Sequence, residues 1–212
     1  MKIALVCLYD KHFEPLTSLT IPPLTAYCQR WGYTPYFGQP DAKYDPRNTW
    51  DRFVILYDLL EQGFDAVMWL DADTILTNHH IRIEDRLGSE KFVLSTDLHG
   101  INAGVMIARN HVLTRELLLS IIQAEKGLFD KHPHREQEML SHYLASPHYE
   151  HLATILPQRM MNAFPHELYG RSTQYPGNWH QGDWIIHFPG MRMFGRLEAM
   201  PPYLKLIEGF SQ

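Results

Sequence analysis

The chain of 212 residues lacks the features that mark several specialised classes of protein. It holds only two cysteines, Cys7 and Cys28, so it has no disulfide framework, and we expect a reducing compartment. No apolar run approaches the ~20 residues of a membrane-spanning helix, and the run at residues 3–8 is too short for a signal peptide. Repeats and low-complexity segments are missing too. We therefore expect one soluble domain over residues 1–212, whether or not a longer protein contains it.

Positive charge is also in short supply. The 19 basic residues are outnumbered by 24 acidic ones, which gives a net charge of −5, so the sequence gives no support for a nucleic-acid partner. Aromatic residues make up 12% of the chain, which suits a groove that stacks bases or sugars and equally suits an aromatic core. Histidines at 79–80 and at 132 and 134 have no matching set of metal ligands, and we expect them in solvated loops.

Hydrophobic patterning predicts alternating strands and helices. The opening order β-α-β-α-β is typical of an α/β fold with a mostly parallel sheet flanked by helices, and such sheets bind ligands beyond the carboxyl ends of their strands. Strands are expected over residues 2–8, 33–37, 66–70, 92–96, 104–108, 153–156 and 184–188. Helices are expected over residues 22–31, opened by Pro22 and Pro23, from Trp50 to a stop at Gly63, and over 112–125, 136–145 and 204–208.

Two carboxylates, Asp71 and Asp73, directly follow the buried strand at 66–70. Residues two apart at a strand end project to the same side, and two like charges beside an apolar strand are costly unless a cation or hydrogen bonds compensate them. The pair therefore predicts a divalent metal, Mn²⁺ or Mg²⁺, and a phosphate-bearing substrate, although carboxylates are also common in turns. The loop that starts at Tyr9 is expected at the same edge of the sheet.

Four segments carry a resemblance to a known family. They are Trp-Leu-Asp-Ala-Asp (69–73), Gly-Ile-Asn-Ala-Gly-Val (100–105), Glu-Gln-Glu-Met-Leu (136–140) and a segment with His-Phe-Pro-Gly (182–192). In this order they resemble the A-type glycosyltransferase fold (GT-A, Rossmann-like), most closely its galactosyl-, xylosyl- and mannosyltransferase family, with the glycogenin-like family related. The resemblance implies a metal-dependent enzyme that moves a sugar from a nucleotide-sugar to a glycan hydroxyl. It favours a UDP-sugar as the donor and retention of the anomeric configuration.

The resemblance also implies roles for individual residues. Asp71 and Asp73 bind Mn²⁺ that bridges the two phosphates of the nucleotide-sugar, and His187 supplies the third protein ligand. Asn102 lies near the transferred sugar, and Gln137 lies beside its anomeric carbon.

Other residues are assigned by their position near these motifs. Nucleotide or diphosphate contacts are expected from Tyr9, Arg52, Ala72, Asp71 and Arg192. Arg192 lies near the position where the family carries a lysine. Candidates for a general base, or for stabilising positive charge at the anomeric carbon, are Asp97, Glu136 and Asp183. Glu136 replaces the aspartate that precedes the glutamine in the family.

Two other functions use part of the same pattern. A metal-dependent phosphohydrolase or nucleotidyltransferase needs the two aspartates but gives no reason for Asn-Ala-Gly-Val or His-Phe-Pro-Gly. A non-catalytic nucleotide-sugar-binding module is free to lose its metal ligands, which are intact here. Because the membrane anchor and stem of secretory relatives are missing, we expect a bacterial or viral glycan pathway in the cytosol.

Overall fold

The main sheet combines parallel strands with one reversed strand. In the residues that this computed structural model describes, 1–127, 129–168 and 175–209, the sheet has six strands in the order β2-β1-β3-β6-β5-β7. β6 is antiparallel to both of its neighbours and the remaining pairs are parallel, so five strands point the same way. The strands are β1 (Ile3–Leu8), β2 (Thr34–Gly38), β3 (Ala66–Leu70), β5 (Phe92–Asp97), β6 (Gly100–Arg109) and β7 (Ala153–Leu156).

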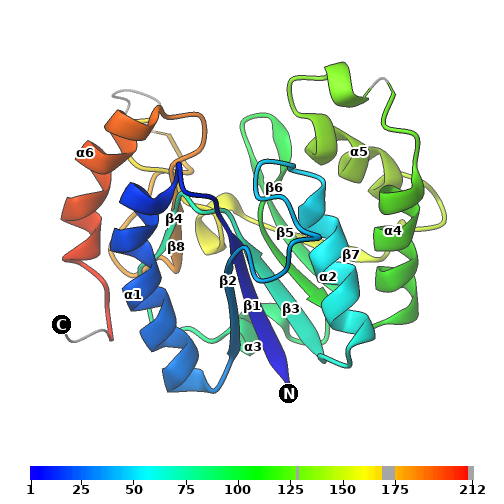
Figure 1. Cartoon of the computed structure of the whole chain (residues 1–212), viewed down its shortest axis with the longest axis horizontal. Coiled ribbons are helices and arrows are strands. Elements are labelled where there is room, and N and C mark those ends of the chain that lie inside the picture. The colour runs from blue at the N-terminus through cyan, green and yellow to red at the C-terminus, as the bar shows by residue number, and fades with distance from the viewer. Residues whose placement is uncertain (128, 169–174, 210–212) are drawn as a thin grey trace.

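Helices cover both faces of this sheet (Figure 1). Alternate residues of β1 explain why: Ala4 and Val6 pack into the cluster that contains α2, α4 and α5, whereas Leu5 and Cys7 pack against α1 and α3. β1 and β3 are therefore buried on both sides, as their continuous apolar sequences predict. The helices are α1 (Glu14–Trp31), α2 (Asp51–Glu61), α3 (Ile83–Leu87), α4 (Val112–Gln123), α5 (Arg135–Leu144) and α6 (Met193–Leu204), with short 3₁₀ turns η1 (Phe129–Lys131) and η2 (Gln158–Met160).

A second, two-stranded sheet joins the C-terminal part of the chain to the segment after β3. β4 (Thr74–Leu76) pairs antiparallel with β8 (Ile185–His187), and Thr74 lies opposite His187. α6 packs beside α1 and over this small sheet. The pairing brings a histidine late in the chain next to the acidic turn between β3 and β4.

The predicted α/β order and the mostly parallel sheet are confirmed, but two helices differ from their predicted bounds. α1 begins at Glu14, so Pro22 and Pro23 lie inside it instead of opening it. Proline removes a helix hydrogen bond, but burial of Leu16 and Tyr27 against the rest of the fold outweighs that loss.

The last helix is the second difference. α6 spans Met193–Leu204, so the helix predicted over 204–208 is wrong; Pro201 and Pro202 lie within α6, whose Met200 and Tyr203 are buried. β6 also begins at Gly100, four residues before the predicted 104, because its first residues pair with the end of β5.

The sequence predicted that His79 lies in a solvated loop, and this prediction is wrong. His79 is 1% exposed and its ring meets the edge of Tyr27. In the described parts of the chain, no helix is both long and apolar enough to cross a membrane.

Candidate functional site

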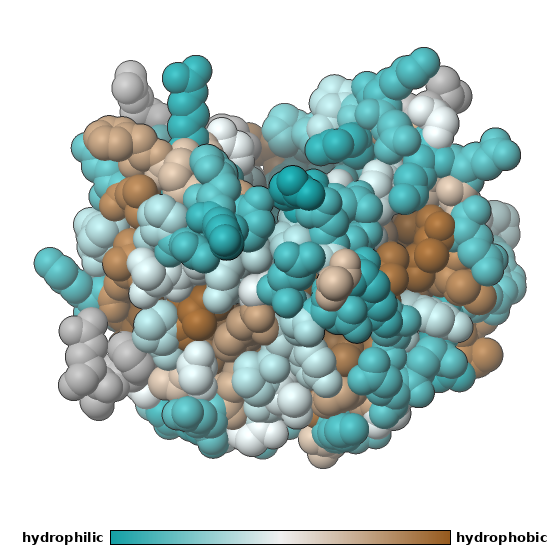
Figure 2. Space-filling view, viewed as in Figure 1, coloured by the Kyte–Doolittle hydropathy of each residue, from teal (hydrophilic) through white to brown (hydrophobic). Residues whose placement is uncertain are grey.

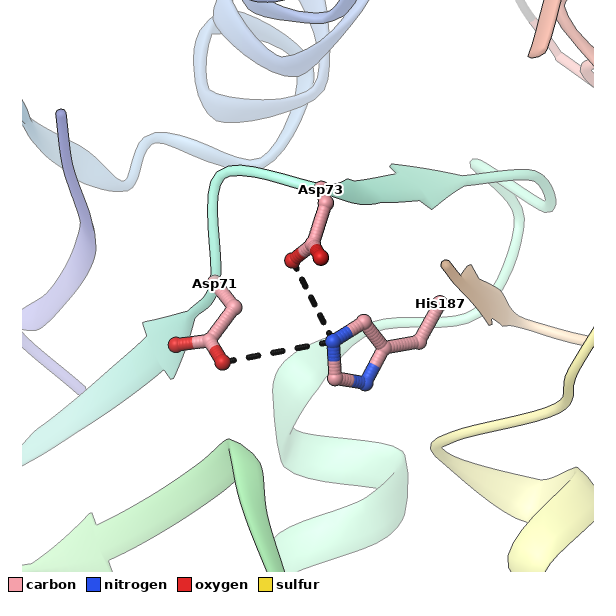
Figure 3. A group of neighbouring side chains, drawn as sticks. All are labelled: Asp71, Asp73 and His187. Atoms are coloured by element: carbon pink, nitrogen blue, oxygen red, sulfur yellow. Dashed lines mark ion pairs between the residues drawn. The ribbon is translucent and has the colours of Figure 1, made fainter. Parts of the chain in front are cut away.

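The turn between β3 and β4 presents two carboxylates to one point. The amide of Asp71 donates to the carbonyl of Gly104 (2.8 Å), and Thr74 donates to the Asp71 carbonyl through both its amide and its hydroxyl. These bonds fix the turn, so the carboxylates of Asp71 and Asp73 project toward the same space (Figure 3).

His187 closes this cluster from the neighbouring strand. Its Nε2 lies 3.2 Å from an Asp73 oxygen and 3.9 Å from an Asp71 oxygen (Figure 3). The three ligand atoms all lie within 4.8 Å of one another. Ligands held at ~2.1 Å around an octahedral ion are about 3 Å apart when adjacent, so this spacing fits a small divalent cation. Two carboxylate oxygens and one imidazole nitrogen also suit Mn²⁺ or Mg²⁺.

The pKa values of the two acids shift in opposite directions because their neighbours differ. Burial raises the pKa of Asp71, an effect that the nearby Arg52 opposes and the Asp73 charge reinforces. Burial acts on Asp73 too, but His187 and Arg196 outweigh it and hold the pKa of Asp73 below its ordinary value. A divalent cation at this point would relieve the cost of burying both charges.

Arg196 is a cationic residue that the sequence analysis missed. Its Nη2 donates to Asp73 Oδ2 (2.6 Å) and its Nε donates to the carbonyl of Phe188 (3.1 Å). Arg192, which was expected at the diphosphate, is the exposed N-cap of α6 and lines neither of the cavities beside the cluster. Arg196 lies four residues after Arg192, which is about one helical turn. The sequence could have pointed to Arg196 only if the start of α6 had been known.

Arg52 lies behind the cluster and connects several segments through hydrogen bonds and ion pairs. It is 7% exposed, and its Nη1 donates to the carbonyl of Ala103 (2.8 Å). Its Nη2 lies 3.3 Å from Asp71 and 3.5 Å from Glu136, and the guanidinium sits 5.2 Å from the centre of the Trp69 ring. Arg52 directly precedes Phe53, a fully buried residue of α2, and its side chain points to the site and not to solvent.

Polar side chains of the β5–β6 hairpin form a second part of the site. Asn102 donates to Asp97 through Nδ2 (2.7 Å) and accepts from the amide of Gly104 through Oδ1 (2.8 Å). The Asp97 carboxylate also accepts from the amide of His99 (2.6 Å). Asn102 is therefore held by hydrogen bonds at both ends of its amide.

The start of α5 contributes two further groups. Gln137 accepts from the amide of Ala103 through Oε1 (3.0 Å). Glu136 is 9% exposed and accepts from the hydroxyl of Thr49 (2.7 Å). Gln137 thus joins α5 to the strand that carries Asn102, and Glu136 joins α5 to the segment at the start of α2.

Two cavities flank the acidic turn. One, of about 550 Å³, is lined by Tyr9, Arg47, Ala72, Asp73 and Arg196, among others. The second, of about 360 Å³, is lined by Asp97, Asn102, Glu136, Gln137 and His187, among others. Arg52 and Asp71 line both. The surface is hollowed between the α6 side and the α5 side, where β1 and its parallel neighbours end, and many of the side chains beside the hollow are hydrophilic (Figure 2).

The sequence of the chain matches a known family. Residues 86–198, more than half of the chain, match the profile of the galactosyl transferase GMA12/MNN10 family. The chain belongs to this family. The matched region contains Asn102, Gln137 and His187 but begins after the acidic turn, so the assignment of Asp71 and Asp73 rests on the geometry above.

This chain is similar in sequence to two proteins of Schizosaccharomyces pombe (strain 972 / ATCC 24843). The probable alpha-1,2-galactosyltransferase gmh2 is 35% identical over 235 residues, and the probable alpha-1,2-galactosyltransferase gmh1 is 25% identical over 222. The alignments cover 91% and 86% of this chain and 58% of each relative, so the chain spans little more than half of their length.

A solved structure has the same fold. The glycosyltransferase involved in the glycosylation of the major capsid of PBCV-1 aligns with a TM-score of 0.70 at 16% identity, over 94% of this chain and 98% of that one. This likeness, together with the mixed sheet, confirms the predicted GT-A fold.

Asp183, which the sequence assigned to the site, lies away from the cluster. Asp183 precedes β8, whereas His187 ends it, so about 13 Å of extended chain separates them. Its carboxylate binds Arg159 through two 3.0 Å hydrogen bonds and accepts from the amide of His180 (2.8 Å). Asp183 lines neither cavity, so its expected place in the site is corrected to a position at the far end of the strand.

Gly104 leaves room for the imidazole of His187. A Cβ added to Gly104 would lie 2.4 Å from His187 Cε1 and 2.9 Å from Asn102 Oδ1. We expect Gly104→Ala to displace the ring and to weaken Mn²⁺ binding by about 10-fold or more, as measured by electron paramagnetic resonance of the free ion. Gly195→Ala in α6, whose new Cβ would meet the Met191 side chain at an ordinary 3.5 Å, is the matched control and should bind Mn²⁺ normally. Unchanged binding in Gly104→Ala would contradict this view of the site.

Proposed function

We propose that this protein is a metal-dependent glycosyltransferase whose residues 1–212 form the catalytic domain. It moves a sugar from a UDP-sugar to a hydroxyl of a glycan acceptor, with retention of the anomeric configuration. The single observation that carries the proposal is the convergence of Asp71, Asp73 and His187 between two cavities, in a chain of the GMA12/MNN10 family. Galactose is the first candidate sugar because the two yeast relatives are named galactosyltransferases.

The larger cavity is assigned to the donor. Asp71, Asp73 and His187 would hold Mn²⁺, or Mg²⁺ in its place, which when bound neutralises the diphosphate and makes it a better leaving group. Arg196, which already contacts Asp73, adds a second positive charge on this side. Tyr9 and Ala72 line the same space and are assigned to the nucleotide-sugar.

The smaller cavity is assigned to the acceptor and the transferred sugar. Breaking the bond to phosphate leaves positive charge at the anomeric carbon, which nearby carboxylate and amide oxygens stabilise. Asp97, Asn102 and Gln137 supply such oxygens, each already fixed by a hydrogen bond. In a retaining reaction the departing phosphate takes the proton of the acceptor hydroxyl, so Glu136 serves to hold Arg52 and not as an obligatory base.

Calorimetry with nucleoside diphosphates tests this proposal. We expect the protein to bind UDP at least ~100-fold more tightly with Mn²⁺ than without it, because the phosphate oxygens need the cation to approach two carboxylates. GDP and CMP, titrated in the same way, report the preference for base and phosphate number. Release of UDP from UDP-galactose in the presence of an acceptor, followed by proton NMR of the new linkage, reports transfer and its stereochemistry.

Two outcomes would contradict the proposal. Equally tight UDP binding with and without metal would indicate a non-catalytic binding module. Turnover of a simple phosphoester in the absence of any sugar would indicate a phosphohydrolase.

A further inference from the structure

Asn162 is a fully buried asparagine that contacts the histidine of the metal cluster from behind. Its exposure is 0%, and its Oδ1 lies 2.7 Å from His187 Nδ1, which is the ring nitrogen that does not face the two aspartates (Figure 3). The next residue fixes it there: the amide of Ala163 donates to the carbonyl of Ile185 (3.1 Å), and the amide of His187 donates to the carbonyl of Ala163 (2.8 Å). The segment after η2 therefore lies against β8 as a short extra pairing.

The hydrogen bond decides which ring nitrogen is available for a metal. A neutral imidazole carries one proton, so an acceptor at Nδ1 keeps the proton there and leaves the lone pair on Nε2. Nε2 is the atom that faces Asp71 and Asp73. We propose that Asn162 is a positioning residue that selects the metal-binding tautomer of His187, an inference that rests on the proposed function.

The Nδ2 atom of Asn162 shows why the orientation of the amide matters. Within the part of the chain that the structure describes, its buried Nδ2 has no hydrogen-bond partner. If the amide were reversed, Nδ2 would donate to Nδ1 and the ring proton would move to Nε2, where it would occupy the position of the metal. Only the orientation with Oδ1 toward the ring leaves His187 able to act as a ligand.

The rest of the surroundings hold the ring in place for this bond. Phe164 meets the imidazole edge-on, with ring centres 6.2 Å apart at 71°. Gly104 approaches Cε1 so closely that no side chain fits between them. The ring is thus confined between β6 and the segment 162–164, and the hydrogen bond to Asn162 sets its proton.

Two substitutions separate hydrogen-bond acceptance from simple packing. Asn162→Leu keeps a similar volume but cannot accept, and we expect Mn²⁺ binding in the presence of UDP to weaken by about 10–100-fold, as is typical when the outer partner of a ligating histidine is lost. Asn162→Asp can only accept, and we expect its Mn²⁺ affinity to stay within about 3-fold of the wild type or to rise. Binding is measured by electron paramagnetic resonance of free Mn²⁺, independently of catalysis.

Asn78→Ala is the matched control for losing a buried asparagine. Asn78 donates to the carbonyl of Gly182 and accepts from the amide of His80, away from the cluster. We expect this variant to lower the melting temperature but to leave Mn²⁺ affinity unchanged. If Asn162→Leu does not fold, Asn162→Ala replaces it with the same expected loss.

The possible results distinguish this inference from the proposed function. Wild-type affinity in folded Asn162→Leu, or an equal loss in Asn162→Asp, would overturn the role of Asn162 while leaving the metal site intact. Failure of the wild type itself to bind Mn²⁺ with UDP would overturn the proposed function. With Mg²⁺ bound, long-range proton–nitrogen NMR should show a protonated Nδ1 at His187, identified by its absence in His187→Ala; a protonated Nε2 would also overturn the inference.

Discussion

Replacing Asp73 with asparagine is expected to weaken Mn²⁺-dependent UDP binding by more than about 100-fold, beyond the effect of losing an outer partner of a ligand. Asp73 is the acid whose pKa is held low, despite its burial, by His187 and Arg196, so it supplies negative charge at neutral pH. Asparagine has nearly the same shape and can still accept from Arg196, but its neutral amide is a weaker ligand for a hard cation. Calorimetry with UDP and Mn²⁺ measures the change.

A carboxylate outside the site provides the comparison. Asp85 also pairs with an arginine, Arg82, at 2.8 Å, but it lines neither cavity. Asp85→Asn should bind UDP and Mn²⁺ as the wild type does. If Asp73→Asn also retained full metal-dependent binding, the assignment of the cluster as a metal site would be wrong.

The residues of the acidic turn and His187, which the sequence predicted, lie at the ends of strands, whereas the predicted Arg52, Glu136 and Gln137 reach the site from helices α2 and α5. The apolar run of β3 ends where two acids begin, and the late strand β8 ends in His187. Strand patterning and the rule that ligands bind at carboxyl ends are enough to bring such residues to one edge. Asn102 reaches this edge for a different reason: β6 runs antiparallel to β3, so the first residues of β6 lie beside the carboxyl end of β3.

The residues that were missed reach the site through contacts that no local pattern records. Asn162 lies in irregular chain after η2 and meets His187 only because Ala163 pairs with β8. Arg196 faces Asp73 because α6 starts at Met193, whereas the sequence predicted the last helix only over 204–208. In both cases tertiary packing sets the position, and packing overrides local propensity.

Arg52 shows how the charged site is compatible with a stable core. Two acids, the half-buried Asp71 and the buried Glu136, come from segments far apart in the sequence, and the charge of each is costly to hold there alone. One guanidinium lies within 3.5 Å of both and also donates to the backbone of β6. Arginine suits this place because its several donors are fixed in one plane and it remains charged when buried. The same residue therefore connects α2, the acidic turn and α5.

Arg52→Ala is accordingly expected to destabilise the metal-free protein by about 3–5 kcal/mol, because Asp71 and Glu136 lose a cationic partner and keep the neutral donors Trp69 and Thr49. Urea unfolding at neutral pH in the presence of a chelator measures this loss. Arg82→Ala, which breaks an exposed ion pair with Asp85, should lower the stability far less and serves as the control.

A double-mutant cycle identifies the cause of the Arg52 effect. In an Asp71→Asn background, Arg52→Ala should cost about 1–2 kcal/mol less than in the wild type, since one of the two unpaired charges is gone. The remainder reflects Glu136, the lost hydrogen bond to Ala103 and the contact with Trp69. Equal costs in the two backgrounds would mean that Arg52 stabilises the fold through Glu136, packing and backbone hydrogen bonds, and that Asp71 does not need it.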